Sequence, residues 1–287
     1  MRIDATRRQP RLFALTIAAT SGLLLSAPIE PARAAEAWPA HVRALYDIEF
    51  NGINVGSFEF NSSAEGNTYN LTGYAKLSAL LGAFHWKGQT NSSGQIVGEA
   101  PKPQAFAFDF KSNSKSGSTR MGFGDGGVTS LVNEPPVREK AGVVPVREQH
   151  LRGVLDPLAA VLALARPAGP NPCTRQLAIF DGKQRFDLQL SHRGQMRIAE
   201  RRPSGQPAMA YVCRVKYVPI AGHKADEANS QLVNEDQIEI ALRPIPSANL
   251  FIPYQITIPT VAGPARMIAK RVDIVGPGGS QQIALIY

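Results

Sequence analysis

The residues that could carry out catalysis in this sequence follow none of the common catalytic patterns. Asp109 and Glu239 could act as the paired carboxylates of a glycoside hydrolase if folding placed them about 5 to 10 Å apart. Cys173 could act as a nucleophile with a distant histidine. The sequence has no G-x-S-x-G elbow and no H-E-x-x-H motif. We therefore predict a protein that is not an enzyme and uses no cofactor, with a hydrolase acting on envelope polymers as the alternative.

Two further patterns bear on ligand binding. Residues 122–127 match the dinucleotide-binding pattern G-x-G-x-x-G, which requires a following helix whose N-terminus holds the pyrophosphate. Residues 128–132 alternate like a strand instead, so we interpret the glycines as a hairpin turn. The histidines are too scattered for a local metal motif, and we predict no metal site. They are His41, His85, His150, His192 and His223.

Positive charges gather in residues 192–202. If this stretch is a strand, alternation places Arg193, Arg197 and Arg201 on one face of a hairpin. One interpretation is a solvated outer face. The other is a basic patch that contacts phosphorylated lipid or acidic envelope glycans, which predicts salt-sensitive binding to anionic liposomes. Both interpretations are compatible with the sequence.

The N-terminus has the layout of a secretory signal peptide. Arginines at 2, 7, 8 and 11 precede an apolar stretch over residues 12–27, and Ala32-Arg33-Ala34 provides small residues for cleavage between Ala34 and Ala35. The apolar stretch is short for a membrane span. We expect residues 1–34 to be removed and the protein to reside in the periplasm. Removal of five arginines and two acidic residues lowers the net charge from +8 to +5, and export makes nucleic acid an unsuitable partner.

The two cysteines, Cys173 and Cys213, then lie in an oxidising compartment. An isolated pair in that setting favours a disulfide. The alternative is two unpaired thiols in the core.

The remaining sequence predicts an all-β protein. Alternating segments with turn signals roughly every ten residues indicate about 14 strands in one large curved antiparallel sheet, a barrel or a spiral. Residues 156–166 differ, because Asp156 suits an N-cap, Pro157 suits the first helical turn and Pro167 ends the pattern. This helix is apolar on all sides and should be buried. We expect residues 35–287 to form a single domain.

Residues 46–60 predict a hairpin with a change of phase. Asn51-Gly52 is typical of a two-residue type I′ turn, and the alternation shifts at Gly56, which indicates a β-bulge. The bulge predicts that four apolar side chains share the core face, namely Ile48, Phe50, Phe58 and Phe60. An apolar link over residues 78–84 is either a core-facing corner or an exposed lip for a lipid or partner.

Several of these features together resemble one bacterial exported family, a domain of unknown function numbered 3108. The resemblance lies in Y-x-I-x-F-x-G-I-x-V-G over residues 46–56, Gly73-Tyr74, Asp156-Pro157-Leu158 and F-D-G-K over residues 180–183. The family pattern also has an arginine near the helix end, matched by Arg166, and a serine where this chain has Ala159. The resemblance implies an exported β-rich protein and carries no catalytic residues. A looser architectural likeness is to periplasmic β-spiral proteins associated with envelope integrity.

These observations predict a non-enzymatic periplasmic protein that binds a lipid, lipoprotein or envelope polypeptide and supports envelope integrity. A purely structural assembly component is the alternative. Peripheral contact with a membrane is compatible with the positive charge.

Overall fold

The computed structural model describes residues 37–79, 82–138, 141–166, 171–224, 238–279 and 281–287. All of them belong to one compact unit, residues 35–287. The predicted signal peptide and its cleavage site at Ala34 and Ala35 lie outside the described residues. In the described part of the chain, no helix is both long and apolar enough to cross a membrane.

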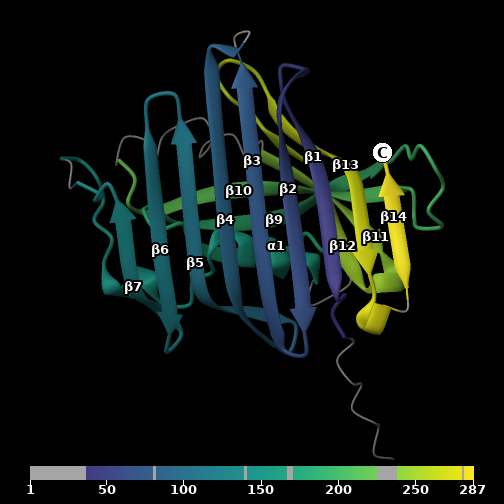
Figure 1. Cartoon of the computed structure of the whole chain (residues 1–287), viewed down its shortest axis with the longest axis horizontal. Helices are drawn as coiled ribbons and strands as arrows, with labels where there is room; N and C mark the ends of the chain where they lie inside the picture. The colour runs from purple at the N-terminus through teal and green to yellow at the C-terminus, as the bar shows by residue number, and fades with distance from the viewer. Residues whose placement is uncertain (1–36, 80–81, 139–140, 167–170, 225–237, 280) are drawn as a thin grey trace, which may run out of the picture. The chain divides into compact units, whose positions relative to one another are not determined.

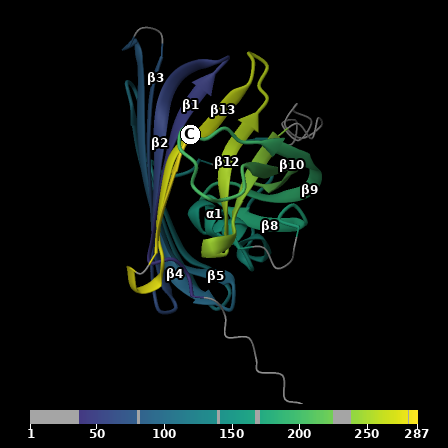
Figure 2. The ribbon, with the colours of Figure 1, turned by 90° about the vertical axis from the view of Figure 1, so that its right-hand side faces the viewer.

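The described residues form one antiparallel sheet of 14 strands (Figures 1 and 2). The strands are β1 (His41–Phe50), β2 (Ile53–Glu65), β3 (Thr68–Ala79), β4 (Phe84–Val97), β5 (Ala100–Ser112), β6 (Ser116–Gly124), β7 (Gly127–Glu134), β8 (Arg175–Phe180), β9 (Arg185–Arg197), β10 (Met209–Ala221), β11 (Ile238–Ile245), β12 (Leu250–Ile258), β13 (Ala265–Val275) and β14 (Gln282–Ile286). The helices are α1 (Pro157–Ala165) and the short 3-10 turns η2 (Glu148–Leu151), η4 (Pro246–Ala248) and η5 (Pro277–Gly279).

The strand order is β7-β6-β5-β4-β3-β2-β1-β13-β12-β11-β10-β9-β8, with β14 beside β13. The all-β prediction with about 14 strands is therefore confirmed. The sheet is curved but not closed into a barrel. Seen from the side, β1–β5 form one wall, β8–β10 form the other, and α1 lies between them (Figure 2).

Bulges bend the sheet, beginning with the one predicted between β1 and β2. Asn51 and Gly52 have φ values of 51° and 79°, as a type I′ turn requires. Ile48 then lies opposite Gly56 and Glu49 opposite Asn54, so one extra residue is inserted on β2. Register shifts recur in five further ladders, and each one increases the local twist of the sheet.

The β1–β2 bulge directs Phe58 and Phe60 to the core face, as predicted. Phe60 is buried, and Phe58 packs against the same apolar cluster. Ile48 and Phe50, in contrast, are half-buried and lie outside the apolar clusters of the described residues. Glycine is required at the bulge itself, because a Cβ at Gly56 would lie 2.0 Å from the carbonyl oxygen of Lys76 on β3. The sequence Val55-Gly56 thus allows β2 and β3 to approach closely where the sheet bends.

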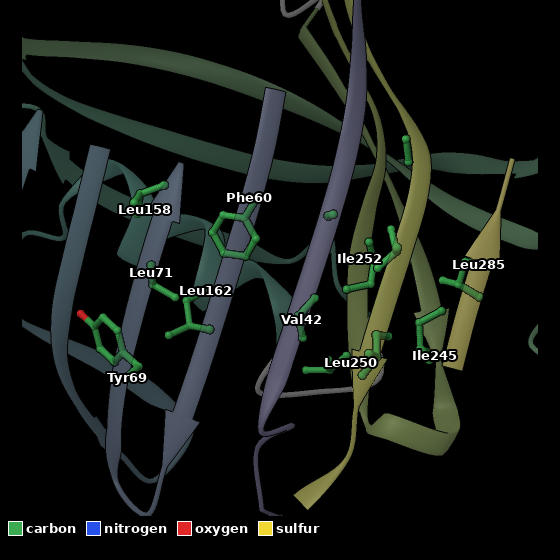
Figure 3. Packing of buried hydrophobic residues seen from close by; sticks show 14 of the residues in the cluster. Val42, Phe60, Tyr69, Leu71, Leu158, Leu162, Ile245, Leu250, Ile252 and Leu285 are labelled. Atoms are coloured by element: carbon green, nitrogen blue, oxygen red, sulfur yellow. The ribbon is translucent and has the colours of Figure 1, made fainter. Parts of the chain in front are cut away.

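Helix α1 fills the concave side of the sheet, which confirms the buried helix predicted over residues 156–166. It has apolar side chains on every face, so it can pack against both walls. Figure 3 shows Leu158 and Leu162 of α1 among side chains from β1–β3 and from β11, β12 and β14. On the other side, Ala160, Ala163 and Leu164 pack with β8–β11.

Asp156 anchors the helix to the sheet. Its Oδ1 accepts hydrogen bonds from the backbone N–H groups of Leu158 (2.9 Å) and Ala159 (3.0 Å), and Ser92 Oγ on β4 donates to Oδ2 (2.8 Å). The carboxyl is completely buried, with Tyr69 nearby. Burial raises the pKa of Asp156 to about 6, although the hydrogen bonds from Ala159, Ser92 and Leu158 favour the charged form.

Replacing Asp156 by asparagine should remove a pH dependence of stability. The folded protein holds this proton more tightly than the unfolded chain does, so the unfolding free energy should fall as pH rises from about 4 to about 6. Asparagine is also a good N-cap and carries no charge. We expect Asp156→Asn to equal or exceed the wild type at pH 7, by up to about 3 kcal/mol. Urea unfolding from pH 4 to 8 measures the difference, and parallel curves for the two proteins would contradict this assignment.

Candidate functional site

The space beside α1 is too small to hold a lipid. The cavity there measures about 40 Å³ and is lined mainly by apolar side chains, including Val42, Phe60, Leu162 and Ile252. A few water molecules would fill such a volume.

A larger hollow lies at the ends of β3, β4 and β5. It measures about 650 Å³, within the usual range for small-molecule sites. We call it the rim hollow and define it by its lining residues: Gly56, Lys76, Leu77, Ser78, His85, Trp86, Lys87, Lys111, Ser112 and Asn113.

Apolar side chains form the inner wall at this end of the sheet. Leu77 on β3 lies opposite Trp86 on β4, and both are half-buried. The Trp86 indole covers Gly88, where a Cβ would lie 2.4 Å from the ring. The Phe110 ring covers Gly117 on β6 in the same way, and a Cβ there would lie 2.7 Å from that ring. Glycine thus allows each aromatic ring to lie close against the backbone. Leu77, Trp86 and Phe110 belong to none of the apolar clusters of the described residues, so this wall stays partly exposed.

Three lysines form a row across the same strands. Lys76 on β3 lies opposite Lys87 on β4, which lies opposite Lys111 on β5. Alternation directs them to the outer face, and all three are exposed. Like charges directly opposite each other are destabilising in a sheet. Within the described ranges, no ion pair involves any of the three. The rim hollow therefore combines an apolar inner wall with a positively charged outer edge.

Asn113 connects the two hairpins that border the rim hollow. Its Oδ1 accepts a hydrogen bond from the backbone N–H of His85 (2.7 Å), and its Nδ2 donates to the carbonyl of Ala83 (2.8 Å). The β5–β6 turn is thereby fixed to the start of β4. His85 is exposed at this rim, as the second residue of β4.

The structure does not form the carboxylate pair considered for a hydrolase. Asp109 accepts two hydrogen bonds from Arg120 Nη2 (2.8 and 2.9 Å) on the exposed outer face of β5. Glu239 lies on β11, which is separated from β5 by six strands of the sheet, and it forms an ion pair with Arg193. Among the described residues, no cluster of three or more His, Cys, Asp or Glu side chains could hold a metal ion.

The three arginines of the predicted basic patch do not share one strand face. Arg193 is the extra residue of a bulge in β9, because Gly194 and His192 pair with consecutive residues of β10. Arg197 is exposed near the end of β9. Arg201 lies in a bend beyond the strand, where its backbone N–H donates to the carbonyl of Ile286 (2.9 Å). The bulge and the end of β9 break the alternation on which the prediction relied.

Two other sequence assignments agree with the structure. Cys173 and Cys213 form a disulfide, so neither is available as a nucleophile. The glycine-rich residues 122–127 connect β6 to β7 through a turn at Asp125 and Gly126, which both have positive φ. A strand and not a helix follows, as the hairpin interpretation predicts.

Comparison with known proteins places this chain in a family. The family model of the proteins of unknown function DUF3108 matches residues 45–270. The chain belongs to the DUF3108 family. The matched region contains α1 and every residue of the rim hollow. Neither the curated proteins nor the solved structures include a match to the chain.

The residues that carried the DUF3108 resemblance stabilise the fold. Arg166, at the end of α1, is buried with its guanidinium 4.3 Å from the centre of the Trp38 ring. It donates hydrogen bonds to the carbonyls of Ala37 (2.8 Å) and Asn249 (3.2 Å). Arg166 thus ties the helix to the segment before β1 and to the β11–β12 turn.

The sequence analysis predicted neither the apolar wall nor the lysine row of the rim hollow. The apolar link over residues 78–84 was the one local signal at this place. The lysine row and the pairing of Leu77 with Trp86 depend on strand register, which brings together residues that are separated along the chain. The spacing of Trp86 and Gly88 on β4 is a signal that an alignment of the strands could have revealed, because the ring of one covers the backbone of the other.

Proposed function

We propose that this DUF3108 protein is a non-enzymatic periplasmic envelope protein that binds an anionic amphiphile at the rim hollow. The amphiphile is an envelope lipid or the acylated end of a lipoprotein. The observation that carries the proposal is the apolar wall of Leu77 and Trp86 beside a row of three exposed lysines. The export signal in the sequence supports the compartment.

The chemistry of the rim hollow matches the two parts of such a ligand. An acyl chain lying along Leu77 and Trp86 would bury apolar surface at about 25 cal/mol per Å². An acidic head group at the rim would be attracted by Lys76, Lys87 and Lys111, and this attraction would weaken with salt. The 40 Å³ cavity beside α1 is too small for an acyl chain, whereas the rim hollow of about 650 Å³ has room for one.

Placing a charge on the apolar wall should abolish binding. We expect Leu77→Asp to weaken the binding of a dansyl-labelled fatty acid by at least about tenfold, because the acyl chain would have to desolvate a carboxylate. Trp86 provides a second readout, since the only other tryptophan, Trp38, lies against Arg166 in the core. In a Trp38→Phe background, a spin-labelled fatty acid should quench the remaining fluorescence.

The matched control is Val97→Asp, at the opposite end of β4, where the side chain is 50% exposed. This variant should bind the probe as the wild type does. Equal binding by the Leu77→Asp variant, or the absence of any lipid after extraction and mass spectrometry of the protein from its native envelope, would argue against the proposal.

A further inference from the structure

The sheet of the described residues has three outer edges, at β7, β8 and β14. On β8, the backbone N–H of Leu155 donates to the carbonyl of Ala178 (2.8 Å), and Leu155 accepts from the N–H of Phe180 (3.0 Å). On β14, Ile286 accepts from the N–H of Arg201 (2.9 Å). Uncovered edges present unpaired N–H and C=O groups that recruit other strands. The chain's own backbone thus covers the second half of β8 but only the last residue of β14.

The third edge, on β7, is open along most of its length. Within the described ranges, only its first residue has a backbone contact on this side: Gly127 forms a β-bridge with Arg152. Next to it, the N–H of Gly153 donates to the carbonyl of Gly126 (2.7 Å). From residue 128 to residue 134, β6 is the only backbone partner among the residues that the structure describes. Figure 1 shows β7 as the outermost strand on this side of the sheet.

The side chains of β7 do not block this edge. Leu131 is 40% exposed and Val132 is 55% exposed, so apolar groups are accessible on both faces of the strand. The strand contains no lysine and no proline, which are the usual devices against strand addition, and its one charge is Glu134 at the end. The ladder from Ser130 to Glu134 is regular, so the open edge is straight enough to template another strand.

A cleft of about 900 Å³ lies beside the inner face of β7. Leu131 and Val143 contribute to its apolar lining, and among the described lining residues Arg138 and Lys183 border it with positive charge beside one carboxylate, Asp181. The Asp181 Oδ1 already accepts hydrogen bonds from the N–H groups of Lys183 (2.8 Å) and Gln184 (2.7 Å) in its own turn. The cleft is therefore apolar inside and positively charged at its border.

We propose that β7 is a docking edge for an extended, acidic segment of a partner polypeptide, which adds to the sheet as a further strand. An extended chain is the ligand whose alternating N–H and C=O groups match the open edge, and alternate side chains would enter the cleft beside Leu131. The excess of cations around the cleft selects acidic side chains or a terminal carboxylate. This inference does not depend on lipid binding at the rim hollow.

Hydrogen exchange with a defined peptide tests the proposal. The probe alternates valine and threonine over the length of β7, 8 residues, and ends in two aspartates. We expect it to slow amide exchange within Gly127–Glu134 by about tenfold or more while leaving β14 unchanged. The same peptide ending in two lysines should bind more weakly, and a version N-methylated at every residue, which blocks both of its edges, should not bind.

Proline variants identify the backbone contact. Adjacent N–H groups of a strand point to opposite sides. Of the two variants Leu131→Pro and Val132→Pro, one therefore removes an N–H that bonds to β6. The other removes an N–H that points to the open edge. The variant with wild-type thermal stability should lose the peptide-induced protection. Wild-type protection in that variant, binding of the N-methylated peptide, or a dimer that buries β7 would each overturn the proposal. The N-methylated peptide remains decisive if both variants unfold.

Discussion

Replacing Arg243 by methionine is expected to lower the unfolding free energy by about 3–5 kcal/mol, because it leaves a buried carboxylate without its partner. The Arg243 side chain on β11 is completely buried, and its Nη1 lies 2.7 Å from Glu200 Oε1. The Glu200 side chain is only 9% exposed. Burial alone would raise the pKa of Glu200, but its contacts with Arg243 and Ser204 hold that pKa below its ordinary value.

The same guanidinium also organises the C-terminus of the chain. Arg243 Nη1 donates to the Tyr287 hydroxyl (3.0 Å), and Nε donates to the carbonyl of Pro207 (3.1 Å). One side chain on β11 therefore ties together the last residue and the connection between β9 and β10. Methionine preserves much of the apolar stem but none of these hydrogen bonds.

A double-mutant cycle separates the ion pair from the packing. Adding Glu200→Gln to Arg243→Met should recover part of the lost stability, since the second substitution removes the unpaired buried charge. Urea unfolding of the four proteins at neutral pH gives the coupling energy. Additive losses would show that Arg243 acts mainly through packing and not through Glu200.

Replacing both cysteines by alanine is expected to cost about 4 kcal/mol, because the disulfide closes a long loop in the unfolded chain. Cys173 and Cys213 are separated by 40 residues, and both are completely buried. The bridge joins the segment before β8 to β10, with β9 between them, and it packs against Ala160, Ala163 and Leu164 of α1. Its loss should therefore also loosen the wall of the sheet that encloses the helix.

Reductant provides the matched control for this prediction. Urea unfolding of the wild type in dithiothreitol should approach the stability of the Cys173→Ala, Cys213→Ala variant, while the variant itself should not respond. A variant as stable as the oxidised wild type would contradict a stabilising role. Full stability of the reduced wild type would assign any loss in the variant to packing.

The local patterns of the sequence predicted the elements well, because each depends on short-range geometry. The Asn51-Gly52 turn requires only two residues that tolerate positive φ, and Asp156-Pro157 needs only its own backbone to begin a helix. The bulge near Gly56 was visible because one inserted residue exchanges the two faces of a strand. The disulfide followed from the expected compartment and from the presence of a single pair of cysteines.

Predictions that extended an alternating pattern across a bulge were wrong. Arg193, Arg197 and Arg201 were expected on one face, but β9 bulges at Arg193 and ends before Arg201. The placement of Asp109 and Glu239 failed for a related reason. Both residues lie in strands, but nothing local indicates how many strands separate them in the sheet.

The sequence by itself determined the strands, their turns, the buried helix and the disulfide, because turn chemistry, side-chain alternation and capping act over a few residues. Only the tertiary structure decided which surfaces these elements create. The lysine row and the Leu77–Trp86 wall arise from the register of β3, β4 and β5. The open edge of β7 exists because, among the described residues, neighbouring backbone reaches this edge only at its first residue, Gly127. Register and edge protection are contacts between residues far apart in the chain, and no local pattern specifies them.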